Sequence, residues 1–297
     1  MSESSPTPDV EALKNASDVA GLVNALDPEV DWHTRDAAAA ALSEVGDDRA
    51  VGPLVNHLGG DTGYLAAETL ANIGTERAVD ALFSSLDVPF TQMGARPSRD
   101  QAAAVAAAHG LGKIAPAGSI ERLVAAVEDE SAAEHTRIRS AGVLAAMERP
   151  ESTAFLGKTL CDPRLRGLVV QGMKNANMRR CDSALAQPLI ALLADADWHV
   201  RGSAVSVLGL VDDPKVVEPL IGCLKDGVYD VRRRAVLELA RRGDTRAIAP
   251  IKRAAAKEPQ MGHWMLEQLK AFPEASPEQM GGAVPKSRQK PWWRFWG

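Results

Sequence analysis

The chain has 297 residues, of which 45% are hydrophobic, 4% are aromatic and 25% are charged, and its formal net charge is −5. A low aromatic content with abundant alanine and leucine favours closely packed helices over a β-sandwich. The net acidic charge argues against a general nucleic-acid-binding protein. The lack of any run of about 18 apolar residues argues against a membrane-spanning one.

The N-terminal end and the cysteines indicate a cytoplasmic protein. Residues 1–10 are polar and contain no apolar run of the length found in a secretory signal peptide. Cys161, Cys181 and Cys223 show no C-x-x-C spacing and no accompanying histidine pattern. We therefore predict neither a disulfide framework nor a zinc site. Residues 1–17 are predicted to be disordered or partly helical.

The predicted helices come in pairs. Apolar residues spaced i, i+3, i+4 and i+7 predict helices over residues 18–26 and 32–45. A later helix over residues 64–73 is expected to end at Gly74, in the position of a C-cap. The pattern continues along the chain and gives about eight helix pairs over residues 18–272.

The third predicted pair carries an insertion. Residues 87–97 separate its two helices, and the second helix restarts at Ser98, with Gln101 three residues later as in a capping box. Insertions of this kind commonly emerge on one face of a solenoid. Phe90 and Met93 are therefore candidate partner contacts. The alternative is that they fold back onto the third and fourth repeats, because exposed apolar side chains favour aggregation.

A period of 31 residues marks the second half of the chain. Pro188, Pro219 and Pro250 align without gaps, each at the start of an apolar helix. Proline suits a first helical turn because its missing N–H would have no intrahelical partner there. Asp197 and Asp230 precede the second helix of their units and are expected to be N-caps. Each unit is thus predicted to be helix, turn, helix.

The units share an Asp-x-x-Val-Arg-x-x-Ala pattern. It lies at residues 197–204 in one unit and recurs, slightly shifted, around Arg232 in the next. This pattern resembles the phycobilisome-lyase (PBS lyase) type of HEAT repeat, and the resemblance covers most of residues 18–272. It implies an all-α fold, an α-solenoid of stacked helix pairs. It implies little about function, because such repeats occur in lyases, hydroxylases and scaffolds.

In repeats of this type the Asp and Arg side chains typically link neighbouring units. The resemblance therefore implies a structural role for Arg35, Arg201 and Arg232, whose guanidinium groups match carboxylates in geometry. Asp197 and Asp230 are the carboxylates expected in these inter-repeat pairs.

The sequence offers little support for an enzyme. A HEAT-like group, the deoxyhypusine hydroxylases, holds two irons through His-Glu dipeptides, and none of the six histidines here precedes a glutamate. His33 and His199 follow Trp32 and Trp198 at equivalent repeat positions, which indicates packing. Nucleophile-elbow, phosphate-loop and zinc-protease motifs do not occur. We predict no catalytic residue, no metal and no cofactor; a bilin (tetrapyrrole) lyase-like, chromophore-handling protein is the enzymatic alternative.

The expected function is a non-catalytic scaffold that binds a protein on the concave face of the solenoid. Residues 1–100 carry 17 acidic and 6 basic side chains, whereas residues 221–260 carry 5 acidic and 10 basic ones. An acidic patch on a partner therefore suits the last repeats. The candidate contacts there are Arg233, Arg234, Arg241 and Arg242. Nucleic-acid binding is a minor alternative, because the basic run is confined to these repeats.

The C-terminal segment differs from the solenoid, which we place at residues 18–274. Residues 275–297 are predicted to be a flexible linker followed by a basic tail. Residues 284–297 carry four basic and no acidic side chains and hold half of the six tryptophans. Such rings beside cations suit a membrane surface or a pocket on a protein, including this solenoid itself. The expected docking residues are Trp292, Trp293, Arg294, Phe295 and Trp296.

Overall fold

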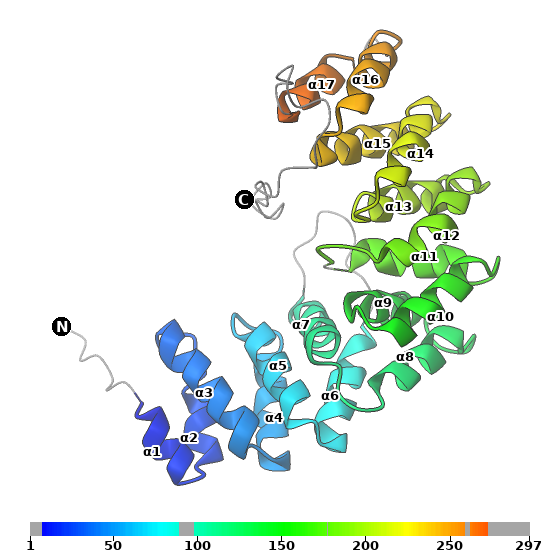
Figure 1. The fold of residues 1–297 in the computed structure, drawn as a ribbon. Helices are drawn as coiled ribbons and strands as arrows, with labels where there is room; N and C mark the ends of the chain where they lie inside the picture. Colours follow the sequence, from blue (N-terminus) through cyan, green and yellow to red (C-terminus); the bar gives the residue numbers. More distant parts are fainter. Residues whose placement is uncertain (1–7, 89–97, 177, 259–261, 273–297) are drawn as a thin grey trace.

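The structure, a computed structural model, describes residues 8–88, 98–176, 178–258 and 262–272. Within these ranges the chain forms 17 α-helices, short 3₁₀ helices and no β-strand. The helices follow one another along a curved arc from α1 to α17 (Figure 1). This is the all-α solenoid predicted from the sequence. No helix in these ranges is both long enough and apolar enough to cross a lipid bilayer.

The helices have the following bounds. The N-terminal half contains α1 (Val10–Asn15), α2 (Val19–Asn24), α3 (Trp32–Val45), α4 (Asp48–His57), α5 (Gly63–Ile73), α6 (Glu76–Leu86), α7 (Arg99–Ile114), α8 (Ser119–Glu128) and α9 (Glu134–Ala146). The C-terminal half contains α10 (Pro150–Leu160), α11 (Arg166–Asn175), α12 (Ala186–Ala191), α13 (Trp198–Leu208), α14 (Val217–Gly222), α15 (Tyr229–Arg242), α16 (Ile248–Ala255) and α17 (Gly262–Gln268). The 3₁₀ helices are η1 (Ser183–Leu185), η2 (Leu192–Ala194), η3 (Pro214–Val216), η4 (Cys223–Lys225), η5 (Thr245–Ala247) and η6 (Leu269–Ala271).

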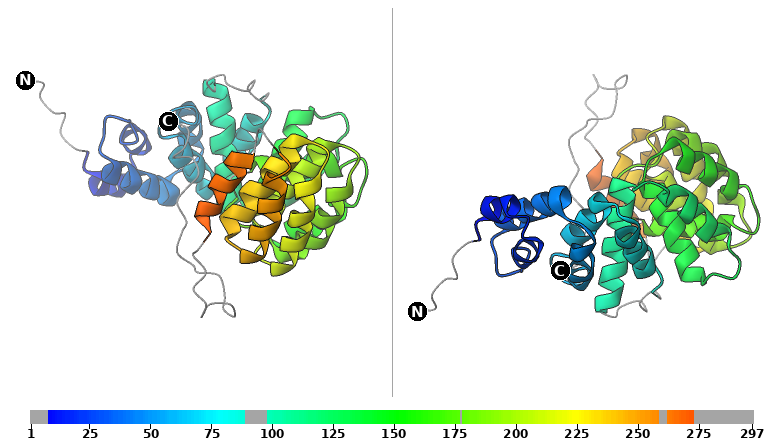
Figure 2. Two further views of the ribbon diagram at one scale, coloured as in Figure 1. Left: turned by 90° about the horizontal axis from the view of Figure 1, so that it is seen from above. Right: turned by 90° about the horizontal axis from the view of Figure 1, so that it is seen from below.

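Helices α2 to α17 form eight pairs, each made of an even-numbered helix and the odd-numbered helix that follows it. The even-numbered helices lie on the outer side of the arc and the odd-numbered ones on the concave side (Figure 1). Each odd-numbered helix from α3 to α15 contacts the next odd-numbered helix, which makes one continuous inner layer. Views from above and below show α1 to α3 at one side and the stacked C-terminal pairs at the other (Figure 2).

Side-chain caps determine where several helices begin. Asp18, Asp31 and Ser98 accept hydrogen bonds from backbone N–H groups in the first turns of α2, α3 and α7. Ser98 and Gln101 form the predicted capping box. Gly74 ends α5 with a φ of 63°, a left-handed conformation that glycine adopts without a Cβ penalty.

The 31-residue units begin with 3₁₀ turns that aspartates initiate. The carboxylates of Asp182, Asp213 and Asp244 accept hydrogen bonds from the backbone N–H two residues later, at 2.9, 2.8 and 3.0 Å. These turns lead into α12, α14 and α16, in which the repeated proline is the third helical residue. The prolines therefore lie within the first helical turn, where a missing N–H costs nothing.

Small residues let the inner helices approach one another closely. A Cβ at Gly172 of α11 would collide with the backbone carbonyl of Ile138 in α9. Gly110 of α7 faces the backbone of Ala67 in α5 in the same way. Leucines such as Leu70 fill the space between the two layers and are fully buried. The high alanine and glycine content is therefore a consequence of the close packing of the stack.

Two local predictions differ from the structure. Asp230 lies in the first turn of α15 rather than at its N-cap, a position that Val228 occupies, whereas Asp197 does cap α13. The repeat position of the Trp32–His33 pair indicates packing, yet Trp32 is 59% exposed and stacks on His33 with ring centroids 3.4 Å apart.

Candidate partner-binding site

The concave surface is the free face of the inner layer. Each odd-numbered helix from α5 to α15 has an even-numbered helix behind it and inner-layer neighbours on both sides. The exposed stripe of such a helix therefore points to the concave side (Figure 1). Tyr64 on α5, Val105 on α7 and Leu237 on α15 are 50%, 50% and 37% exposed. These side chains are apolar anchors that a partner could bury.

A polar cluster joins α5 and α7 on this surface. Lys113 Nζ donates to Glu68 Oε2 at 2.6 Å, and His109 Nε2 lies 2.7 Å from Glu68 Oε1. The ring of His109 also meets that of Tyr64 edge to face, with centroids 5.0 Å apart. Burial opposes ionisation of Glu68, but the bonds with Lys113 and His109 outweigh it and hold the pKa of Glu68 below its usual value. The charge of this carboxylate is thus satisfied within the protein.

Three of the four predicted arginine contacts on α15 are engaged internally. Arg233 lies 3.5 Å from Asp230, and Arg241 lies 2.7 Å from Glu238. Arg242 donates to the backbone carbonyls of Val211 and Asp213, between α13 and α14, at 2.6 and 3.0 Å. These guanidinium groups have acceptors already, so a partner would have to compete for them.

Glu238 is a partly buried carboxylate of α15, with a side chain that is 18% exposed. It packs against the backbone of α13 at Gly209, where an added Cβ would overlap its carboxylate. Burial raises the pKa of Glu238, and its pairing with Arg241 opposes that rise only in part. The Glu238 carboxylate therefore forms its ion pair with Arg241 and not with another cation.

Arg234, the fourth of these arginines, has an internal hydrogen bond but no ion pair in the described ranges. Its side chain lies over Gly202 of α13, with Nε 3.3 Å from the place where a Cβ would stand. Nη1 donates to Ser206 Oγ at 3.2 Å, whereas Nε is buried and has no hydrogen-bond partner in the described part of the chain. Burial lowers the pKa of Arg234, and the neighbouring charge of Arg233 adds to the effect.

Lys174 lies on α11, and α13 contacts both α11 and α15. Burial lowers the pKa of Lys174, and the charge of Arg234 lowers it further. Among the residues that the structure describes, no carboxylate forms an ion pair with Lys174 or with Arg234. Neither cation therefore has a paired counter-ion in the described part of the chain.

Ion pairs link successive units of the C-terminal half. They are Arg166–Asp195 at 2.8 Å, Arg201–Asp226 at 2.7 Å and Arg232–Glu258 at 2.7 Å. The Arg201 fork is bidentate, because Nη2 also donates to the other oxygen of Asp226 at 2.9 Å. Its Nη1 donates to the Asp195 carbonyl at 2.9 Å, in the turn before its own helix. Arg201 thus links the turn before α13 to the turn before α15 in the next unit.

The acids in these links are not those expected from the sequence. Asp197 caps its own helix, and Asp230 pairs within its own helix. The linking acids Asp226 and Glu258 instead follow the outer helix of the next unit. Arg35 Nε is buried without a hydrogen-bond partner in the described ranges. The sequence pattern located the linking arginines Arg201 and Arg232 but assigned them the wrong partners.

The predicted contacts in the insertion and in the tail are not placed. Phe90 and Met93 lie outside the described residues. The same holds for Trp292, Trp293, Arg294, Phe295 and Trp296. Their roles stay predictions from the sequence.

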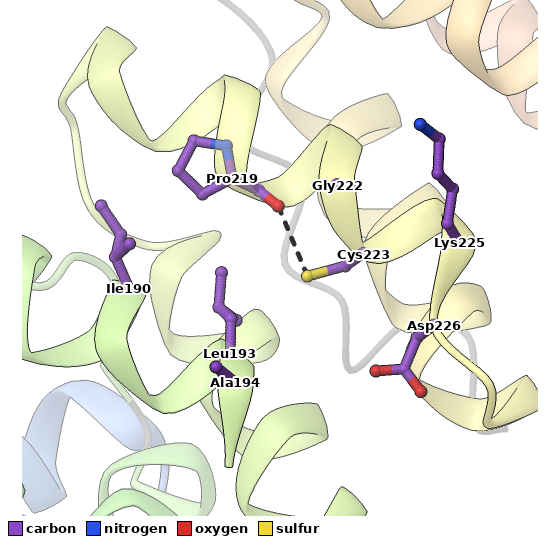
Figure 3. Close-up of a pocket in the computed structure, with 8 residues that line it drawn as sticks. All are labelled: Ile190, Leu193, Ala194, Pro219, Gly222, Cys223, Lys225 and Asp226. Atoms are coloured by element: carbon purple, nitrogen blue, oxygen red, sulfur yellow. Dashed lines mark hydrogen bonds between the residues drawn. The ribbon is translucent and has the colours of Figure 1, made fainter.

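A shallow apolar groove lies on the outer layer between α12 and α14 (Figure 3). Ile190 and Leu193 face Pro219 and Cys223 of the next unit across it. Cys223 Sγ donates to the Pro219 carbonyl oxygen at 3.4 Å. Burial raises the pKa of this thiol to about 11, so it is protonated and a poor nucleophile at neutral pH. The charged rim residue Asp226 already belongs to an inter-unit ion pair.

Within the described ranges, no group of three or more His, Cys, Asp and Glu side chains is arranged to hold a metal ion. Cys181 is buried, which raises the pKa of its thiol to about 12. Cys161 is exposed at the end of α10.

Comparison with known families identifies the repeats. The family model described as HEAT repeats matches residues 186–262, which cover α12 to α16, and that of the PBS lyase HEAT-like repeat matches residues 34–60, in α3 and α4. Both matched segments are HEAT-type repeats. These segments lie in both halves of one continuous helical array, so the repeat architecture is not confined to one end. No curated protein matches the sequence.

Several solved structures resemble this chain. Human deoxyhypusine hydroxylase in complex with glycerol is 21% identical, with 77% of this chain and 87% of that chain covered and a TM-score of 0.34. YibA of Escherichia coli is 18% identical, with 91% and 99% covered and a TM-score of 0.39. The complex of CpcE and CpcF of phycocyanin lyase from a Nostoc species is 21% identical, with 77% and 86% covered and a TM-score of 0.29. Similarities this low carry no conclusion about activity.

Proposed function

We propose that this protein is a non-catalytic scaffold that binds a protein partner along its concave face. The observation that carries the proposal is the continuous inner layer, whose exposed stripes present apolar anchors beside charged groups. Stacked repeats create extended concave surfaces, and a helix or peptide laid across them contacts several units at once. Binding energy is then drawn from a few buried anchors within a wide contact area.

The anchors lie in two places along the arc. Tyr64 and Val105 stand on the neighbouring helices α5 and α7, and Leu237 stands on α15 in the C-terminal half. The outer groove offers only a shallow patch between two units. An elongated partner that spans the arc therefore gains more from the concave side than from the outer side.

Paired substitutions on the two faces test this proposal. Val105→Glu with Leu237→Glu adds two charges to the concave side, and Ala154→Glu with Ala249→Glu adds the same charge to exposed positions of the outer helices α10 and α16. The tagged chain is used to capture proteins from native lysate, and the captured proteins are identified by mass spectrometry. We expect one partner to be retained by wild type and by the outer variant and lost from the concave variant. Equal retention by both variants contradicts the proposal.

We also propose that the C-terminal tail provides a second contact, with a membrane surface or with the partner. Support comes from the sequence, in which residues 284–297 combine three tryptophans with four basic and no acidic side chains. Such a segment gives reversible attachment, since even one acyl chain binds membranes with about 10⁴ M⁻¹. Flotation with anionic vesicles compares the full chain with a truncation after Ala283. Equal recovery of the two proteins with the vesicles contradicts the membrane contact.

A chromophore-handling function is the second candidate. Its support is the match of the PBS lyase HEAT-like repeat to residues 34–60. The purified protein is mixed with an open-chain tetrapyrrole, and the visible absorption spectrum is recorded. A shifted and intensified band favours this candidate, whereas an unchanged spectrum argues against it.

A further inference from the structure

We infer that the basic C-terminal segment of this chain, residues 284–297, docks on the first helices of its own inner layer, at Trp32 on α3 and Tyr64 on α5. The contact is made within one chain, so it does not depend on the proposed scaffold function. A partner that buries Tyr64 would displace the segment and thereby free it for a contact elsewhere.

The two aromatic side chains lie on the same edge of the inner layer. Trp32 is the first residue of α3 and Tyr64 is the second residue of α5, and they are 59% and 50% exposed. At the other end of the two helices, a Cβ at Gly46 would lie 3.0 Å from Ile73 Cδ1, so α3 and α5 run in the same direction. Packed helices lie about 8–10 Å apart. One short segment can therefore contact both rings.

Each ring has a carboxylate near it in the chain that takes part in no ion pair within the described ranges. Asp36 lies one turn after Trp32 on α3, and Asp61 lies in the turn that leads into α5, three residues before Tyr64. Both carboxylates are exposed. An Arg or Lys side chain bound there would contact the face of a ring and a carboxylate together, which favours a cation. Residues 1–100, with 17 acidic and 6 basic side chains, add to this preference.

The C-terminal segment has the matching chemistry. Residues 284–297 carry four basic and no acidic side chains, together with three tryptophans and one phenylalanine. The described part of the chain ends at Phe272, and residues 273–291 can span up to about 60 Å when extended. A flexible linker gives a tethered segment an effective concentration of about 1 mM. An affinity of about 0.1 mM would then keep about nine molecules in ten docked.

The C-terminal half offers a ring in the same position but not the same charge. Tyr229 is the first residue of α15 and is 50% exposed. Its neighbour Asp230 is paired with Arg233, and residues 221–260 carry 5 acidic and 10 basic side chains. A basic segment is therefore repelled there and attracted to the N-terminal half. The acids of the N-terminal half also disfavour a nucleic acid, whose bases could otherwise stack on the rings.

Photo-crosslinking within the full chain tests the docking. A benzophenone amino acid replaces Phe295, the purified protein is irradiated at a low and at a high concentration, and the linked peptides are identified by mass spectrometry. We expect cross-links within one chain to the parts of α3 and α5 around Trp32 and Tyr64. Asp36→Lys with Asp61→Lys should lower their yield about tenfold, because the segment then meets two cations in place of two carboxylates.

The matched control is Glu76→Lys with Glu121→Lys, at exposed positions of the outer helices α6 and α8. It changes the net charge of the chain by the same amount and leaves the inner layer unaltered, so the yield should fall by less than about twofold. Equal yields from the two double variants overturn the inference, as do cross-links that map to the outer layer or to α15. Products that join two chains and increase with concentration also overturn it, because they assign the segment to a second copy.

Two further measurements guard against a charge reversal that perturbs folding, which circular dichroism monitors. Trp32→Ala removes an exposed ring and should lower the cross-link yield about threefold, whereas Tyr229→Ala should leave it unchanged. Equal yields from these two variants overturn the inference. Added salt should lower the yield of the unsubstituted benzophenone protein, because exposed charges are screened. A yield that does not change with salt contradicts docking through charge.

Discussion

Glu68 lies in the N-terminal half of the inner layer and Glu238 in the C-terminal half. Their surroundings shift the pKa values of the two carboxyl groups in opposite directions. Glu68 on α5 receives Lys113 and His109 from the next inner helix, and its pKa is held below the usual value. Glu238 on α15 is pressed against α13, and its partner Arg241 belongs to its own helix. Burial therefore prevails at Glu238 and raises its pKa.

This difference shows how charge is distributed along the concave face. In the N-terminal half the basic groups on α7 meet an acid across the helix boundary, so the surface charge is satisfied there. In the C-terminal half, Lys174 and Arg234 have no ion pair within the described ranges. The charged groups described on α5 and α7 are therefore paired, whereas Lys174 and Arg234 are not.

The largest effect is expected from breaking an inter-unit link of the C-terminal half. The side chains of Arg201 and Asp226 are 15% and 10% exposed. Arg201→Met leaves Asp226 buried without its partner, which costs about 3 kcal/mol of unfolding free energy. Arg164→Met is the control, because this arginine is 74% exposed and its loss should lower the unfolding free energy far less. Urea denaturation compares the two, and similar losses would show that the link is not a structural tie.

The stability of the protein should be nearly as sensitive to a substitution at a point where two inner helices approach closely. Gly172→Ala places a methyl group against the backbone of α9 and is expected to cost about 2 kcal/mol. Gly52→Ala in α4 meets open space and should stabilise the protein by about 0.5 kcal/mol, since it removes a helix-interior glycine. Thermal unfolding of the two variants measures the contrast. Equal shifts of Tm in the same direction contradict the packing described for α9 and α11.

The contrast between the two glutamates predicts opposite pH dependences. Glu68 has a folded-state pKa below 4.5, so its stabilisation is present above pH 4.5 and is lost as the pH falls through the folded-state pKa. Glu238 has a raised pKa, so its contribution is present below pH 4.5 and is lost as the pH rises through the folded-state pKa. Glu68→Gln and Glu238→Gln should each remove a pH dependence of the unfolding free energy. The two pH dependences should have opposite signs. The unfolding free energy of each is measured against pH, with differences of about 1 kcal/mol or less. Slopes of the same sign would refute the contrast.

The smallest effect concerns the ionisation of Lys174. Its ammonium should deprotonate below the usual 10.5, because burial and the charge of Arg234 both disfavour it. Reductive methylation with ¹³C and NMR titration resolve this lysine from exposed ones such as Lys252. Arg234→Gln should move the pKa of Lys174 upward. An unchanged value in that variant would show that the two cations do not interact.

Much of the helical framework could be predicted from local sequence. Helix α3 spans the predicted residues 32–45 because Asp31 caps its start and Gly46 follows its end. The proline period predicted the units correctly, although each proline is the third residue of its helix, since a 3₁₀ turn initiated by an aspartate precedes it. Helix caps, helix-ending residues and the spacing of apolar residues depend on contacts within a few residues of one another. For that reason they can be recognised in the sequence.

The candidate site could be predicted only in part, because its contacts join residues far apart in the chain. The arginine run on α15 was visible, but whether each guanidinium group is engaged depends on packing against α13, as at Arg242. The sequence pattern offered Asp197 and Asp230 as the partners of the linking arginines. The acid that pairs with Arg201 is Asp226, after the outer helix of the next unit. Lys174 had no local signal at all.

The central claim is that a partner lies on the concave face, and site-specific photo-crosslinking tests it most directly. A benzophenone amino acid is placed at Val105 or Leu237 on the concave side, or at Ala154 or Ala249 on the outer side, and cells are irradiated. We predict that both concave positions form an adduct with the same protein and that the outer positions form none. Adducts from the outer positions, with none from the concave ones, would contradict the claim.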